Sequence, residues 1–267
     1  MFETNTLALA SRNRVANLSL QGLLHAQAFA AEPVTLQAAR LYNWNRLPAS
    51  AWRRACAEPA RVAALSIPAA GRNWTQAAPG PPISPWCVWR PRHDPRQPNG
   101  RVWKLYVSPA PLHLAEAVAA ALRAAADLPV ISLKYGGDAN GLLRPDKLVI
   151  HLASAAAVDL LASRLLASLA GCPPHGVPFT AELGGGGLVS WGCDPPAGSS
   201  DAAIAPSWRS WLTHLLAEAL AQPHPAAAEP WQAALNRIAQ AGVNPATWAP
   251  SRRLWAAARP TLTGEPT

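Results

Sequence analysis

Two segments in which polar and apolar side chains alternate constrain the fold of this chain most strongly. Segment 102–108 reads VWKLYVS and segment 130–135 reads VISLKY. Successive side chains of a β-strand point to opposite faces of its sheet. Each segment therefore predicts a strand with one apolar face for a core and one face that carries an amine. If the two strands are neighbours in a sheet, Lys104, Tyr106 and Lys134 meet on one surface.

Lysine is rare in this chain, which gives the amines on these strands more weight. Lys104, Lys134 and Lys147 are the only lysines among 23 lysines and arginines. An ammonium loses its proton when its surroundings lower its pKa, whereas a guanidinium effectively cannot. The pattern indicates that the chemistry of this region needs amines. A chance cluster of surface lysines is the alternative interpretation.

The remaining periodicity predicts an α+β fold with a mainly antiparallel sheet, packed helices and a helical N-terminal cap. Further strands are expected at 86–90 and 148–152, and in a hairpin in which PFTAEL and LVSWG flank four glycines. Apolar residues recur at helical spacing in several other segments. These segments are 5–46, 108–129, 155–170, 207–221 and 230–241.

Composition along the chain predicts four regions. Residues 1–66 are expected to form the helical cap, in which Pro59 breaks a short helix. Residues 67–100 are rich in proline and glycine and predict a linker around the strand at 86–90. Residues 101–196 are expected to form the α+β core, and residues 197–267 the C-terminal helices.

Composition also limits the classes of partner. The net charge of +8 favours an anionic partner, but the arginines are scattered, so no nucleic-acid partner is expected. Cys56, Cys87, Cys172 and Cys193 have neither metal-ligand nor disulfide-framework spacing, so no metal site is expected. The chain shows no secretory signal and no apolar run long enough to span a membrane, so a cytoplasmic protein without a membrane partner is expected.

Cations held close together predict a particular chemistry. Each one disfavours the charged form of the others, so one lysine can serve as a base. Lys104, Arg144 and Lys147 can then hold a phosphate, Arg144 in a bidentate manner. The Tyr106 phenol can protonate a departing oxygen. A base, a phosphate clamp and an acid suit the elimination of phosphate from phosphoserine or phosphothreonine, a step that needs no metal or other cofactor.

The order of these motifs resembles known lyases. WKLYVSPAP, a helix and then ISLKYG resemble the lyase module of class III lanthipeptide synthetases (the LanKC type), which is itself similar to the phosphothreonine lyase effectors OspF and SpvC. RPDKLVIHLAS and HGVPFTAELGGGGLVSWGCDPP resemble the Hop-type bacterial effector family. Stand-alone members of that family serve as lyases in class V lanthipeptide and thioamitide pathways. The resemblance covers about residues 101–196.

The resemblance implies roles for individual residues. It places the base that removes the α-proton at Lys134 and the lysine that positions substrate or phosphate at Lys104. It places a phosphate-binding residue at Arg144. Tyr106 stands where the family has its general-acid histidine, and His151 is a possible alternative acid, although a lone strand histidine is more often only hydrogen-bonded.

The hairpin differs from that of the LanKC module, which carries phosphate-binding arginines. Here the corresponding strands read FTAEL and LVSWG and hold no cation. Arg209, Arg252 or Arg253 could fold over the site in their place, or a partner protein could supply the missing arginine.

The resemblance implies a lyase that converts phosphorylated Ser or Thr of a precursor peptide into dehydroamino acids in lanthipeptide-type biosynthesis. Its partners would be the phosphorylated precursor peptide, a separate Ser/Thr kinase and possibly a cyclase. A non-catalytic relative that binds the kinase or the leader peptide is the alternative from another class. A secreted effector that acts in a host is a third possibility.

Overall fold

The computed structural model describes residues 13–50, 59–77, 86–92, 101–222, 229–251 and 254–255. Its helices are α2 (Arg14–Ala26), α3 (Val34–Tyr42), α5 (Pro59–Ala70), α6 (Leu114–Ala124), α7 (Ala139–Leu142), α8 (Ala155–Ser168), α9 (Ser200–Ile204), α10 (Trp208–Ala221) and α11 (Pro230–Gln240), with 3₁₀ turns at Gln27–Phe29 and Pro111–His113.

The described strands form a single antiparallel sheet of seven, in the order β1-β2-β4-β5-β3-β7-β6. They are β1 (Trp74–Gln76), β2 (Trp86–Pro91), β3 (Trp103–Val107), β4 (Val130–Gly136), β5 (Leu148–Leu152), β6 (Ala181–Leu183) and β7 (Val189–Cys193). This confirms the predicted α+β class and its mainly antiparallel sheet. β5 pairs with both β3 and β4, so the two amine-bearing strands are separated by one strand.

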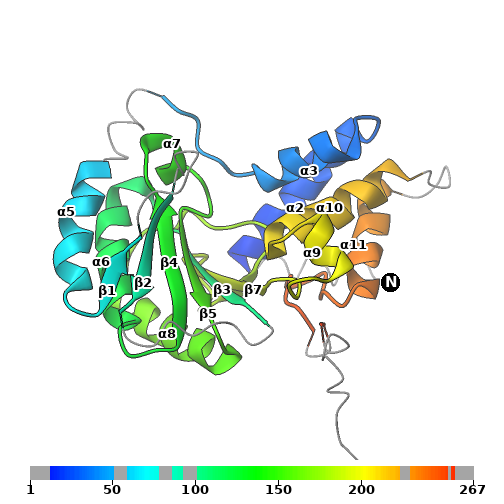
Figure 1. The fold of residues 1–267 in the computed structure, drawn as a ribbon. Coiled ribbons are helices and arrows are strands. Elements are labelled where there is room, and N and C mark those ends of the chain that lie inside the picture. Colours follow the sequence, from blue (N-terminus) through cyan, green and yellow to red (C-terminus); the bar gives the residue numbers. More distant parts are fainter. Residues whose placement is uncertain are drawn as a thin grey trace, which may run out of the picture.

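One face of the sheet carries the main hydrophobic core. Leu105, Val107, Leu133 and Ile150 point to this face and are fully buried. Helices α5, α6 and α8 cover it, and Figure 1 shows them together on one side of the strands. The apolar positions of the alternating segments therefore supply the core, as their pattern predicts.

A second group of helices lies beyond β3 and β7 (Figure 1). Helices α2, α3, α10 and α11 pack around their own buried cluster, which includes Trp208, Trp248 and Phe179. The Trp208 ring lies against the backbone of Gly192 on β7, where an added Cβ would approach ring atom Cδ1 to 2.3 Å. Only a residue without a side chain permits this close packing of α10 on the sheet. We call α2, α3, α10 and α11 the helical lobe.

A buried carboxylate, Asp146, also joins the helical lobe to the sheet. Asp146 precedes β5 and binds side chains from two lobe helices: Arg209 Nη1 of α10 at 2.9 Å and the Tyr42 hydroxyl of α3 at 3.0 Å. Arg144 Nε, two residues away, donates to its other oxygen at 2.9 Å. Burial alone would raise the pKa of Asp146, but Arg209 and Arg144 hold that pKa well below its usual range.

The region from 59 to 100 differs from the sequence expectation. Pro59 is the first residue of α5, where its missing N–H costs nothing, and the part of the expected helix that precedes it, residues 51–58, lies outside the described residues. The expected strand at 86–90 is present as β2, and it pairs with β4 and with the unpredicted strand β1. The described part of the expected linker therefore adds two strands to the sheet, and α5 packs against it.

Two further expectations concern cysteine and membranes. Cys87, Cys172 and Cys193 are free thiols, and Cys56 lies outside the described residues. Among the helices that the structure describes, none combines the length and the apolar character needed to cross a bilayer.

The Asp146 junction generates a prediction about stability. Asp146→Asn leaves the fully buried Arg209 without its carboxylate, and breaking a buried ion pair typically costs roughly 3–5 kcal/mol. Because the pKa of Asp146 is depressed in the folded state, its contribution is present above the unfolded pKa of about 3.9 and is lost as pH falls through the folded value. Urea unfolding at pH 7 measures the change.

The matched control is Asp159→Asn, because Asp159 is exposed at the start of α8. This variant should unfold within about 0.5 kcal/mol of the parent chain. Equal stability of the two variants would contradict the role given to Asp146.

Candidate functional site

The second face of the sheet gathers the polar positions of the alternating segments. Strand register places Lys104 of β3 opposite His151 of β5, and Tyr106 opposite Val149. Val149 in turn lies opposite Lys134 of β4. Lys104, Tyr106 and Lys134 therefore share one face, as the sequence predicts, with β5 between the two lysines.

Lys134 is the half-buried amine of this face. Its Nζ lies 4.6 Å from the centre of the Trp86 ring, a cation–π contact with the neighbouring strand β2. Burial lowers the pKa of Lys134 to about 8. The positive charges of Lys104 and Arg144 act in the same direction, and the carboxylates of Asp146 and Asp194 act against it. A substantial fraction of this amine is thus unprotonated near neutral pH, which is what a general base requires.

Lys104 is buried and paired. Its Nζ lies 2.7 Å from Asp194 Oδ2. The other carboxylate oxygen of Asp194 accepts a hydrogen bond of 2.7 Å from the Trp208 backbone N–H, at the first residue of α10. Asp194 therefore fixes Lys104 between the sheet and the helical lobe.

Arg144 and Arg209 share Asp146 but differ in exposure. Arg209 is 1% exposed and also donates to the Pro178 and Tyr42 carbonyls, at 3.1 and 2.7 Å. The Arg144 side chain is 22% exposed, and its guanidinium carbon lies 5.2 Å from the centre of the Trp86 ring that Lys134 also contacts. Arg144 is thus the more accessible of the two arginines, whereas Arg209 is fully buried on the other side of their shared carboxylate. Arg252 and Arg253 lie outside the described residues.

Tyr106 lies on the same face, but its side chain is buried. Its ring packs with Val149 and Val177 in a small buried cluster. Burial raises the pKa of Tyr106 well above its usual value, the charge of Asp194 raises it further, and Arg209 lowers it. The phenol is therefore neutral at physiological pH and a weak proton donor.

His151 lies between the two lysines. Its Nδ1 is 3.1 Å from the Ser132 hydroxyl. Burial holds the pKa of His151 well below its usual value, and the charges of Lys104 and Lys134 act in the same direction. The imidazole is neutral at physiological pH, so it does not hold the extra proton that the predicted alternative acid would donate.

Lys147 does not join the other cations of this face. It is fully buried, and its Nζ lies 2.8 Å from the Pro109 carbonyl and 2.7 Å from His175 Nδ1. His175 Nε2 lies 2.7 Å from the Asn45 carbonyl, which can only accept, so Nε2 carries the proton and Nδ1 accepts from Lys147. Burial lowers the pKa of Lys147 to about 7. The structure gives Lys147 a role in joining loops, in place of the predicted contact with phosphate.

This face has more positive than negative charges, an excess that can bind an anion. Four cations, namely Lys104, Lys134, Arg144 and Arg209, face the two carboxylates Asp146 and Asp194, so two positive charges remain when Lys134 is protonated. A phosphomonoester carries close to two negative charges at pH 7. Within the described residues, no group of His, Cys, Asp and Glu is arranged to hold a metal ion.

Sequence reasoning missed the acidic and aromatic members of this face. Asp146 and Asp194 stand in RPDK and WGCDPP, both motifs of the resemblance, yet no role was expected for either. For Asp146 the available signal was its place between Arg144 and Lys147, whereas nothing local to Asp194 links it to Lys104. Tyr42 and Trp86 come from segments expected to form the cap and the linker, and nothing local to them predicts their place here.

Comparison with known proteins gives matches in structure alone. No family model matches the sequence, and no curated protein matches it. The effector protein from Pseudomonas syringae pv. tomato strain DC3000 is similar with a TM-score of 0.58 and 12% identity, over 90% of this chain and 99% of the effector. The effector protein from Pseudomonas syringae pv. syringae strain 61 has a TM-score of 0.53 and 16% identity, over 88% of this chain and 100% of the effector.

A phosphothreonine lyase effector of Chromobacterium violaceum, VirA (SpvC), is also similar, at a TM-score of 0.38 and 13% identity, over 45% of this chain and 65% of that protein. The two Pseudomonas likenesses extend over nearly the whole of both effectors. This chain therefore has the fold of these two Pseudomonas syringae effector proteins.

Proposed function

We propose that this chain eliminates phosphate from a phosphorylated serine or threonine in a peptide and leaves a dehydroamino acid. One observation carries the proposal: Lys134 is a half-buried amine with its pKa lowered to about 8, beside the partly exposed cation Arg144. A deprotonated amine next to an anion-binding group suits removal of a proton close to a bound phosphate. The resemblance of residues 101–196 to lyase modules supports the same chemistry.

The proposed step moves two protons and one leaving group. Neutral Lys134 Nζ takes the proton from Cα of the phosphorylated residue, and the electrons of that C–H bond form a Cα=Cβ double bond. The Cβ–O bond breaks and its electron pair leaves with the phosphate. Lys134 ends as an ammonium, and no bond forms between the protein and the substrate.

The phosphate is held by cations already in place. Arg144 offers its partly exposed guanidinium, which can bind two phosphate oxygens at once. Lys104 adds a second positive charge on the same face, fixed by Asp194. Because both cations are anchored by carboxylates, they need little rearrangement when negative charge develops on the leaving phosphate.

The departing phosphate takes a proton from the Tyr106 hydroxyl in this proposal, and after product release the phenolate regains a proton from solvent while the Lys134 ammonium loses one to solvent. The charges of Asp194 and Arg209 act on this phenol, which indicates that it lies close to the ionic groups while its ring packs on Val149. Its raised pKa makes it a weaker acid than histidine, so its contribution to the rate is expected to be small.

The biological setting is part of the proposal. The substrate is a ribosomally made precursor peptide of lanthipeptide type, phosphorylated by a separate Ser/Thr kinase. A cyclase would consume the dehydroamino acids, because these are electrophiles toward thiols. This setting follows from the sequence resemblance of residues 101–196.

A second function, binding without catalysis, is favoured by one observation. Neither candidate acid is ready to donate: the pKa of Tyr106 is raised and the pKa of His151 is lowered. In this alternative, the chain binds the kinase or the leader peptide through the same face and catalyses no reaction.

The Lys134 base predicts the direction of the pH dependence. The unprotonated fraction of Lys134 increases as pH rises through about 8, while the phosphate, with a second pKa of about 6, stays dianionic. The kcat/KM for a phosphothreonine peptide should therefore increase from pH 6.5 through about 8 and then level off. Mass spectrometry measures the loss of phosphate together with the gain of a double bond.

Lys134→Ala should lower kcat/KM by at least about a hundredfold, a typical loss for a general base. Arg237→Ala is the matched control, since Arg237 is an exposed cation on α11, away from the site. Elimination that persists in Lys134→Ala would exclude this base. The absence of elimination in the parent chain, with the kinase and a phosphorylated peptide present, would favour the binding-only alternative.

Tyr106→Phe tests the proton donor. The substitution keeps the ring that packs with Val149 and Val177 and removes only the hydroxyl, so the fold should be unchanged. We expect kcat to decrease by about tenfold to a hundredfold, at or below the lower limit of about a hundredfold that is typical of general acids, because the raised pKa makes this phenol a weak acid. An unchanged kcat, with the same melting temperature, would limit Tyr106 to packing.

A further inference from the structure

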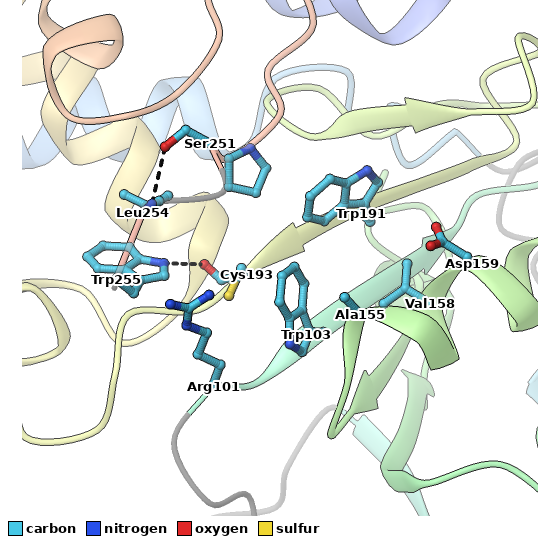
Figure 2. A pocket seen from close by; sticks show the side chains of 11 residues that line it. Arg101, Trp103, Ala155, Val158, Asp159, Trp191, Cys193, Ser251, Leu254 and Trp255 are labelled. Carbon is cyan, nitrogen blue, oxygen red and sulfur yellow. Dashed lines mark hydrogen bonds between the residues drawn. The ribbon is translucent and has the colours of Figure 1, made fainter. Parts of the chain in front are cut away.

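A separate pocket of about 350 Å³ lies on the opposite face of the strands that carry the lysines. Strand residues Trp103, Trp191 and Cys193 form one wall, and the start of α8 forms another. Pro250, Ser251, Leu254 and Trp255 close the third side (Figure 2). This volume lies in the range of pockets that take a small ligand or one or two side chains.

The pocket is apolar in its centre and charged at its two ends. The indoles of Trp103 and Trp191 lie with their ring centres 5.6 Å apart, and Leu254 faces them from the far wall. Figure 2 shows Arg101 at the end near Trp255, whereas Asp159 lies at the other end. Among the ion pairs formed within the described residues, none includes Arg101 or Asp159.

The pocket is adjacent in sequence to the candidate site at two points. Trp103 lines the pocket while the next residue, Lys104, faces the cations; Cys193 lines the pocket while the next residue, Asp194, binds Lys104. The pocket and the cation face therefore meet around one end of β3 and β7. A peptide that reaches both must pass around this end of the strands, so at least about four extended residues, roughly 13 Å at about 3.3 Å each, must separate its two binding positions.

We propose that this pocket binds an acidic–apolar residue pair of the peptide substrate, at least about four residues from the phosphorylated residue. The inference rests on the proposed function, because it requires a peptide that also reaches the cation face. Tryptophan and arginine are the side chains most often found where a peptide or protein is held tightly. Arg101 selects a carboxylate at one end, and Asp159 repels a second carboxylate at the other.

Two other occupants fit the pocket less well. A phosphate would lie against apolar walls near the Asp159 carboxylate, so the cation face is the better site for it. Covalent attachment at Cys193 is disfavoured, because burial raises the pKa of that thiol to about 12 and leaves it protonated.

Binding is measured first, in the Lys134→Ala variant so that no turnover interferes. The probes are fluorescein-labelled, unphosphorylated heptapeptides that differ only in their central pair: Asp-Phe, Asn-Phe or Asp-Ala. Fluorescence anisotropy should show the Asp-Phe peptide binding about tenfold more tightly than either of the others. Equal affinities, or no binding below about 1 mM, would overturn the proposal.

Two variants locate that binding. Arg101→Gln removes the charge at one end and should abolish the preference for Asp-Phe over Asn-Phe. Ala155→Trp places an indole on the exposed first residue of α8, at the pocket wall, and should weaken Asp-Phe binding about tenfold by filling the space. A preference that survives Arg101→Gln would place the peptide elsewhere.

Turnover separates this inference from the proposed function. In the unmodified chain, a phosphothreonine peptide with Asp-Phe five residues away should have a KM about tenfold lower than its Asn-Ala counterpart, with the same kcat. If both peptides lose phosphate with equal KM values, the inference about the pocket is wrong and the proposed function stands. If neither peptide loses phosphate, the proposed function fails, and the anisotropy result still decides whether the pocket binds the pair.

Discussion

The buried carboxylates of Asp146 and Asp194 are the interactions on which the rest of this structure depends. Four cations on one face of a sheet repel each other, and burial makes that repulsion stronger. Asp146 holds Arg144 and Arg209, and Asp194 holds Lys104. Each carboxylate also binds the helical lobe, through α3 and α10 for Asp146 and through α10 alone for Asp194. The same groups therefore neutralise the cations and attach the lobe to the sheet.

This arrangement distinguishes Lys134 from the other cations. Among the ion pairs that the described residues form, none includes Lys134; its ammonium contacts the Trp86 ring instead. A cation–π contact compensates less for lost hydration than a carboxylate at hydrogen-bond distance does. Lys134 is thus left with a lowered pKa, while the paired cations remain available to bind an anion. The proposed base and the proposed anion-binding groups differ because of the partners that the fold gives them.

The sequence predicts the faces of this sheet better than it predicts the site. Alternation in segments 102–108 and 130–135 places Lys104, Tyr106 and Lys134 correctly, because side-chain direction in a strand is a local property. The partners of these residues are not local. Tyr42 and Trp86 reach the site only through tertiary packing. β1 was missed because it is short and lies in a Pro/Gly-rich segment, and its pairing with β2 places it in the sheet.

Lys147 shows why a lowered pKa does not by itself identify a base. The pKa of Lys147, about 7, lies below that of Lys134, about 8. Lys147 is fully buried, however, and its amine already binds the Pro109 carbonyl and His175. A base must also reach the proton that it removes. Lys134 is half-buried beside the partly exposed guanidinium of Arg144, so access, more than acidity, is the property that supports the proposed role of Lys134 as the base.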